Sequence, residues 1–116
     1  MVIPLSFLGS DWAKRFYPPS RRNAVVFEEP WESVDRVRLH VPEGWAVESF
    51  PGAASERVDA IATEIAAAVE GDALVLSRTL RTTAGRWPVD RYDDIRRVVG
   101  RSSAVSRAEV VLRRVP

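Results

Sequence analysis

Apolar and polar residues alternate along much of the first half of the chain, which is the pattern of half-buried β-strands. Residues 34–41 and 45–50 alternate in this way, and residues 24–27 form a short apolar run. Pro42-Glu43-Gly44 separates the two alternating stretches, and Pro51-Gly52 ends the second one, as expected of turns. We therefore expect three strands before residue 52.

Residues 56–69 fit two periodicities at once. Apolar residues recur at every fourth position from Ile61 to Val69, and the high alanine content also favours a helix. Every second position over the same stretch is apolar or threonine, which favours a strand instead. Gly71-Asp72 then separates this stretch from a clear strand over residues 73–83, and a turn at that place is typical of a hairpin.

One amphipathic helix is predicted near residues 90–105. Apolar residues follow helical spacing through this stretch, and Asp90 is a candidate N-cap. Asp93 and Arg97 are spaced to form an i, i+4 ion pair. Gly100 weakens the middle of the helix, so we expect the helix to bend or end there.

The two ends of the chain differ in pattern. Residues 109–115 predict a closing strand, whereas residues 84–88, before the helix, predict a connection. Residues 1–21 are irregular, with a short helical turn capped by Ser10 or Asp11 and ended by a pair of prolines. This segment carries aromatic residues that would either pack on the core or contact something outside the chain.

These elements predict a mostly β fold with a minor α component. We expect an antiparallel β-sandwich of about six or seven strands with one helix near residues 90–105. A chain of 116 residues forms one hydrophobic core. We divide it into a lead-in segment, residues 1–21, and a single β-sandwich-like domain, residues 22–116.

The composition excludes several kinds of chemistry. The chain has no cysteine and one histidine, His40. It therefore cannot form a disulfide, supply a thiol nucleophile, or bind a metal through cysteines or through two histidines. His40 falls on the polar face of its strand, which favours a surface position over a catalytic one. We predict no catalytic, cofactor-binding or metal-ligating residue, no cofactor and no enzymatic activity.

Charged residues are distributed unevenly along the chain. The formal net charge is +1, but residues 1–74 carry seven basic and twelve acidic side chains, and residues 75–116 carry ten basic and four acidic ones. An arginine-rich half is one way to bind nucleic acid. Because interleaved strands would place the two halves side by side, we do not expect a nucleic-acid partner. The acidic run from Glu28 to Asp35 lacks the spacing of a calcium loop and indicates a solvated segment.

Aromatic residues outside the predicted strands mark a candidate contact surface, because amphipathic rings are common at interfaces. They are Trp12, Phe16, Tyr17, Trp31 and Trp87. Two arginines, Arg22 and Arg78, are the charged residues that we most expect to be paired. Arg78 shares a strand face with leucines, so the alternative is an edge position from which its charge reaches solvent.

Several short motifs occur in an order and spacing that resemble a known domain over about residues 22–115. They are, along the chain, Arg22 before an apolar strand, Pro42-x-Gly44-Trp45, Phe50-Pro51, Arg78 near the centre of a hairpin strand, Tyr92 at the head of the helix, and Val110-Val111-Leu112. This pattern is similar to the small C-terminal β-domain, a domain of unknown function, of bacterial transglutaminase-like proteins.

The resemblance implies that residues 56–69 form a strand. It also implies a non-catalytic accessory domain that packs on or positions a transglutaminase-like catalytic core, in the same chain or encoded nearby, because the Cys-His-Asp core of those proteins has no counterpart here. The alternative is a free-standing binding module for a peptide or a saccharide. We also expect self-association through residues 1–21 and no membrane span. The compartment stays open: extracytoplasmic if a parent protein is exported, with no signal peptide pattern at residue 1.

Overall fold

A computed structural model describes residues 1–9 and 11–116 of the chain. The described part holds one α-helix, short 3-10 helices labelled η, and nine strands. In chain order the elements are β1 (Val2–Pro4), η1 (Asp11–Phe16), β2 (Val25–Phe27), β3 (Trp31–His40), β4 (Trp45–Ser49), β5 (Ala54–Arg57), β6 (Ile61–Glu70), β7 (Ala73–Thr82), β8 (Gly85–Trp87), η2 (Val89–Arg91), α1 (Tyr92–Ala104), η3 (Val105–Arg107) and β9 (Glu109–Arg114).

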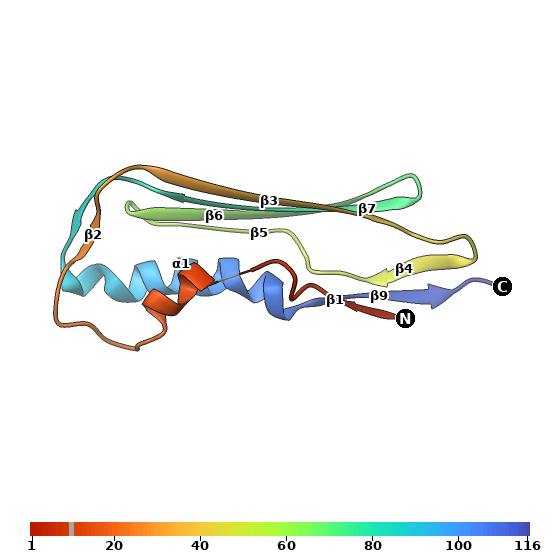
Figure 1. Cartoon of the computed structure of the whole chain (residues 1–116), viewed down its shortest axis with the longest axis horizontal. Coiled ribbons are helices and arrows are strands. Elements are labelled where there is room, and N and C mark those ends of the chain that lie inside the picture. Colours follow the sequence, from red (N-terminus) through yellow and green to blue (C-terminus); the bar gives the residue numbers. More distant parts are fainter. Residues whose placement is uncertain (10) are drawn as a thin grey trace.

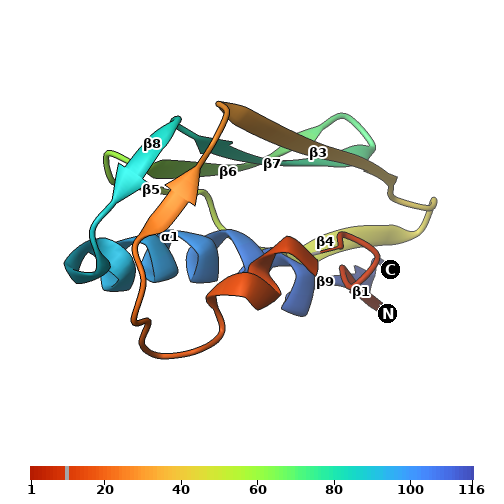
Figure 2. The same ribbon diagram turned by 60° about the vertical axis from the view of Figure 1, so that its left-hand side comes forward.

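The elements form two layers in an elongated molecule of 57 × 23 × 18 Å (Figure 1). One layer is a four-stranded antiparallel sheet in the order β3-β7-β6-β5. The other layer places α1 end to end with a three-stranded sheet in the order β1-β9-β4. A two-stranded ribbon of β2 and β8 joins the layers at one end (Figure 2). The mostly β fold with one helix is confirmed, and the layer opposite the large sheet is divided between helix and sheet.

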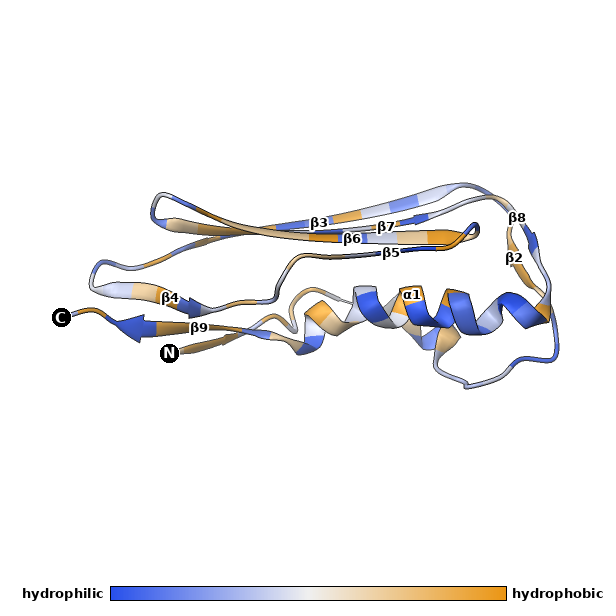
Figure 3. Cartoon of the chain, turned by 180° about the vertical axis from the view of Figure 1, so that it is seen from behind, coloured by the Kyte–Doolittle hydropathy of each residue, from blue (hydrophilic) through white to orange (hydrophobic). Residues whose placement is uncertain are grey.

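The ambiguous stretch is a strand, as the resemblance implied. β6 pairs with β7 along its whole length and with β5 on its other side. The alternating pattern therefore predicts its structure correctly, and the helix propensity of its alanines does not. Ile61, Thr63 and Ile65 point inward and are buried. The start of the stretch belongs to β5, a separate strand that the sequence did not predict. β6 is apolar or nearly neutral along most of its length, whereas α1 mixes apolar and strongly polar residues (Figure 3).

A substitution on the outer face of β6 distinguishes a strand from a helix. Ala66 is exposed and lies opposite Ser77 of β7. Ala66→Thr should raise the free energy of unfolding by about 0.5 kcal/mol, because a β-branched side chain fits the pleated surface better than alanine. Ala104→Thr, at the exposed end of α1, should lower it by a few tenths of a kcal/mol. Urea denaturation measures both changes, and a loss of stability in Ala66→Thr would contradict the strand.

The helix lies where the sequence placed it, but details of its ends differ. Asp90 does not cap it: Asp90 lies within η2, which runs directly into α1, and the N-cap residue Arg91 makes no side-chain cap bond. Arg97 pairs with Asp94 (3.0 Å) and with Glu56 of β5 (3.5 Å) instead of Asp93, because β5 lies beside this face of the helix. The helix also continues through Gly100 to Ala104.

Residues at the start of the chain belong to the fold. β1 pairs with β9, and Leu5 and Leu8 are buried against the small sheet. Ala13 and Phe16 are buried in a second cluster, between α1 and the far end of the large sheet. Ser10, one of the two predicted cap residues, lies outside the described residues. Residues 84–88, expected as a connection, contain β8, which pairs with β2.

Candidate functional site

An open cleft lies between η1, the ribbon strand β2 and the end of the large sheet. Its volume is about 410 Å³. Four aromatic residues line it: Trp12 and Phe16 from η1, Phe27 from β2 and Trp31 from the start of β3. The rings of Phe16 and Phe27 are 6.5 Å apart between centroids and tilted by 42°. Ile61, Leu80 and Val99 also line the cleft, so its inner surface is largely apolar.

The cleft brings together three of the five aromatic residues that the sequence proposed for contact. Phe16 is buried, Trp12 is half-buried against the core, and Trp31 is 44% exposed. The other two lie elsewhere. Trp87 is half-buried and lies near Val58 and Ile95. Tyr17 is exposed and faces a different groove.

Polar groups lie around the apolar part of the cleft. Thr82, at the end of β7, is 6% exposed, and its Oγ1 atom has no hydrogen-bond partner among the described residues. Glu28 and Glu29 on one side and Arg15 on another are exposed charged residues of the lining. A ligand that combined apolar or aromatic groups with a hydrogen-bonding group near Thr82 would fit this arrangement. The sequence missed Phe27 and Thr82; the only signal for Thr82 is that it shares the inward parity of Leu80.

Arg78 supports the cleft from behind. Its side chain is 2% exposed and donates two hydrogen bonds to Asp35 of β3, at 2.7 and 3.0 Å. It also donates to the carbonyl oxygens of Gly9, at 2.7 Å, and Ser102, at 3.3 Å. Its guanidinium group lies 5.8 Å from the centre of the Trp12 ring. The expectation that Arg78 is paired is confirmed, and through Trp12 this buried cation fixes one wall of the cleft.

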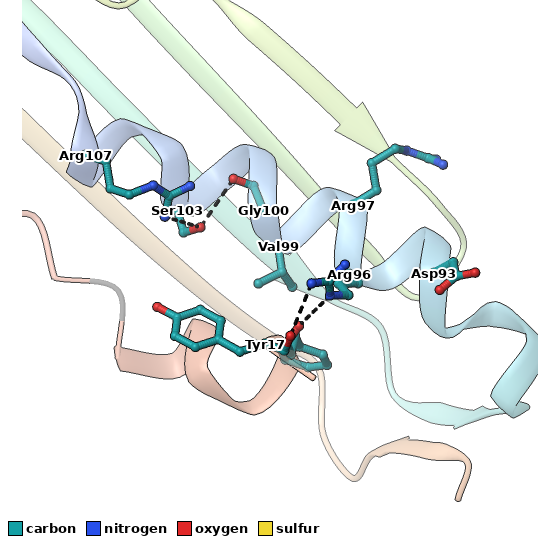
Figure 4. Close-up of a pocket in the computed structure, with 9 residues that line it drawn as sticks. Tyr17, Asp93, Arg96, Arg97, Val99, Gly100, Ser103 and Arg107 are labelled. Carbon is teal, nitrogen blue, oxygen red and sulfur yellow. Dashed lines mark hydrogen bonds between the residues drawn. The ribbon is translucent and has the colours of Figure 1, made fainter. Parts of the chain in front are cut away.

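A second concavity, of about 490 Å³, lies between α1 and η1 (Figure 4). Arg96 points across it and donates hydrogen bonds to the carbonyl oxygens of Phe16 and Tyr17, both at 3.2 Å. Arg107 lies 3.4 Å from the hydroxyl of Ser103. Because these two arginines are engaged within the chain, the concavity mainly holds η1 against α1 and is the weaker candidate site.

The remaining motif residues have structural places. Gly44 has a φ of +85°, which favours glycine, and the turn closes with a bond from the Trp45 N–H to the Pro42 carbonyl oxygen (3.1 Å). Pro51 follows β4 in the link to β5. Tyr92 is buried at the start of α1. Arg22 is exposed, and no hydrogen bond or ion pair joins it to any described residue, so its pairing stays a prediction.

The charged residues are dispersed over the molecule. His40 is exposed on the outer face of β3, as predicted, 3.9 Å from Asp72. Arg81 pairs with Glu32, and Arg101 lies 3.7 Å from Glu56. The arginines of the C-terminal half thus lie on several elements, and acidic residues of the N-terminal half lie beside some of them.

Within residues 1–9 and 11–116, no three histidine or acidic side chains gather as a metal site would require. None of the helices in this described part has the length and the apolar character needed to cross a bilayer.

No family model matches the chain, and no curated protein matches it by sequence. By structure, it is similar to a protein described as "a putative protease from Parabacteroides distasonis ATCC 8503", with a TM-score of 0.66 and 13% sequence identity. The match covers 91% of this chain but 19% of the other chain. At this identity the similarity concerns the fold, and this fold forms about a fifth of that longer protein.

Proposed function

We propose that this chain is a non-catalytic accessory domain that packs on a transglutaminase-like catalytic core and positions it. The aromatic cleft carries this proposal, because large rings gathered at an open surface are typical of contact sites between proteins. Trp31 is the exposed anchor of this surface, and Trp12 is held in place from behind by Arg78. An apolar segment of the catalytic core would bind in the aromatic cleft.

Two further observations support an accessory role. The same fold occurs as about a fifth of a longer solved chain, so this fold can exist as one domain of a multidomain protein. The chain also has no cysteine, so a transglutaminase-type thiol would have to come from another domain.

A second candidate function is a free-standing module that binds a peptide or a saccharide. It is favoured by the Thr82 hydroxyl, which lies in an aromatic cleft and has no partner in the part of the chain that the structure describes. A ring face with a nearby hydrogen-bonding group suits a polar ligand that stacks on aromatic residues. Quenching of tryptophan fluorescence by neutral oligosaccharides, without any binding to a core, would favour this alternative.

The Trp31→Ala variant tests the role of the cleft. The probe is the transglutaminase-like polypeptide encoded in the same reading frame or in a neighbouring gene, titrated with this chain by calorimetry. We expect one-to-one binding, and Trp31→Ala should weaken it about 10- to 30-fold, as truncation of an aromatic anchor does.

Phe50→Ala is the matched control, because Phe50 is an exposed aromatic residue that lies outside the cleft lining. It should change the affinity for the core less than about twofold. The proposal fails if no Cys-His-Asp core is encoded beside this chain, or if the core binds both variants as tightly as the unsubstituted chain.

A further inference from the structure

β3 forms one edge of the large sheet and leaves backbone groups unused on its free side. In the sheet order it pairs with β7 alone. Among the described residues, no backbone hydrogen bond occupies its other side. An open edge of ten residues is a place where a further strand can add.

One hydrogen bond identifies which residues face the free side. The Val41 N–H donates to the Asp72 carbonyl oxygen (2.7 Å), and these two residues lie opposite each other when the β3–β7 register is extended by one step. In antiparallel pairs, hydrogen-bonded residues recur at every second position. The odd-numbered residues of β3 therefore bond to β7, and the even-numbered residues turn their N–H and C=O groups to the free side.

The same even-numbered residues place their side chains on the outer face of the sheet. Their acidic and basic side chains are arranged so that two antiparallel copies of the strand could pair opposite charges. Val34 is 60% exposed. Glu32 and Arg36 flank it at equal spacing, one acidic and one basic. Arg36 is exposed and has no hydrogen bond or ion pair to any described residue, whereas the next arginine, Arg38, is paired with Glu70 at 3.3 Å.

We propose that a second copy of this chain pairs with β3 in the antiparallel sense, with the two-fold axis at Val34. This register places the two Val34 side chains together at the centre. It places the Arg36 of each copy opposite the Glu32 of the other, so Arg36 gains an acidic partner. Glu32, which also pairs with Arg81 of β7 at 3.0 Å, then lies between two arginines. A two-fold axis at Arg36 would instead place two arginines opposite each other, which is unfavourable.

Local features limit this pairing to the central part of β3. Pro30 lies just before the strand and has no N–H to donate, so the ladder of hydrogen bonds between the two copies ends there.

In this dimer the two large sheets form one continuous sheet across the two-fold axis. This surface differs from the N-terminal segment, residues 1–21, for which the sequence predicts self-association. The inference does not depend on the proposed function.

Sedimentation and light scattering over a range of protein concentrations test the inference. The mass should rise from 13.0 kDa toward twice that value as the concentration increases. Arg36→Glu and Glu32→Arg should each weaken the dimer at least about tenfold, because each places like charges opposite each other at two symmetric positions. The double variant Glu32→Arg/Arg36→Glu exchanges the charges and should restore the dimer.

Arg57→Glu is the matched control, because Arg57 is an exposed arginine on β5, at the opposite edge of the same sheet. It should leave the dimer unchanged. Circular dichroism checks that each variant is folded, and Val34→Lys gives a second disruption of the same edge. A mass of one chain at several hundred micromolar, well above ordinary dimer dissociation constants, would overturn the inference. A dimer that survives Arg36→Glu, or that the charge exchange does not restore, would overturn it as well.

Discussion

Arg78→Ala should lower the free energy of unfolding by about 3 kcal/mol, because it removes the buried cation that neutralises Asp35 inside the fold. The same change leaves the carbonyl oxygens of Gly9 and Ser102 without their donor. These partners belong to the N-terminal segment and to α1, so one side chain connects both to the large sheet. We take the lower end of the usual range because Asp35 retains 34% exposure.

Urea denaturation at low micromolar concentration measures this change without a contribution from self-association. Arg57→Ala is the control: it removes an exposed arginine from the same sheet and should change stability by less than about 0.5 kcal/mol. The double variant Arg78→Met/Asp35→Leu should recover part of the loss, because it removes both charges and leaves apolar groups of similar length. If Arg78→Ala lowered the free energy of unfolding no more than Arg57→Ala does, the buried arginine would not stabilise the contacts between the N-terminal segment, α1 and the large sheet.

Tyr92→Ala should be at least as damaging, with a loss of about 3–5 kcal/mol. Tyr92 is among the largest fully buried side chains, and its ring lies 6.4 Å from that of Phe16 in a stacked arrangement. Its hydroxyl donates a 2.5 Å hydrogen bond to the Pro18 carbonyl oxygen. The alanine variant therefore leaves a cavity beneath η1. It also removes the hydrogen bond that holds Pro18, just after η1, against α1.

Tyr92→Phe separates these two contributions, because it keeps the ring and removes only the hydroxyl. Its cost should be about 1 kcal/mol, the usual net value of one hydrogen bond. Thermal unfolding followed by near-ultraviolet circular dichroism measures both variants. Equal losses for phenylalanine and alanine would contradict the view that ring packing dominates at this position.

Arg78 and Trp12 connect stability to the cleft. The guanidinium group lies behind the Trp12 ring, whose side chain lines the cleft. Loss of Arg78 should therefore weaken the rigid support of one wall of the contact surface, in addition to its effect on unfolding.

The sequence predicted the elements well where a single periodicity was present. Residues 73–83 alternate, and β7 occupies nearly the same residues; the helix near residues 90–105 is α1. The stretch at 56–69 stayed open on the residues alone because alanine is compatible with both structures. Short elements such as β1, β5 and β8 were missed because three or four residues show no periodicity.

The candidate site could be predicted only in part. The aromatic residues of the N-terminal segment and of the start of β3 were singled out as contact residues, but nothing in the sequence indicated that Trp12, Phe16 and Trp31 share one cleft while Trp87 does not. Thr82 and Phe27 were not predicted as cleft residues. Each belongs to a strand without a functional motif, and each lines the cleft only because the fold brings residues from other elements next to it.

By itself, the sequence determined the helix and the strands that show a single periodicity, the inward parity of Arg78, the polar face that carries His40, and the absence of cysteine chemistry. Local periodicity records which side of an element is buried, so these features need no knowledge of distant neighbours. The tertiary structure decided the rest: the partners of Arg78, the convergence of the cleft residues and the free edge of β3. Arg78 meets groups from Gly9, Asp35 and Ser102, which are far apart in the chain, and such contacts depend on how the layers pack rather than on any local pattern.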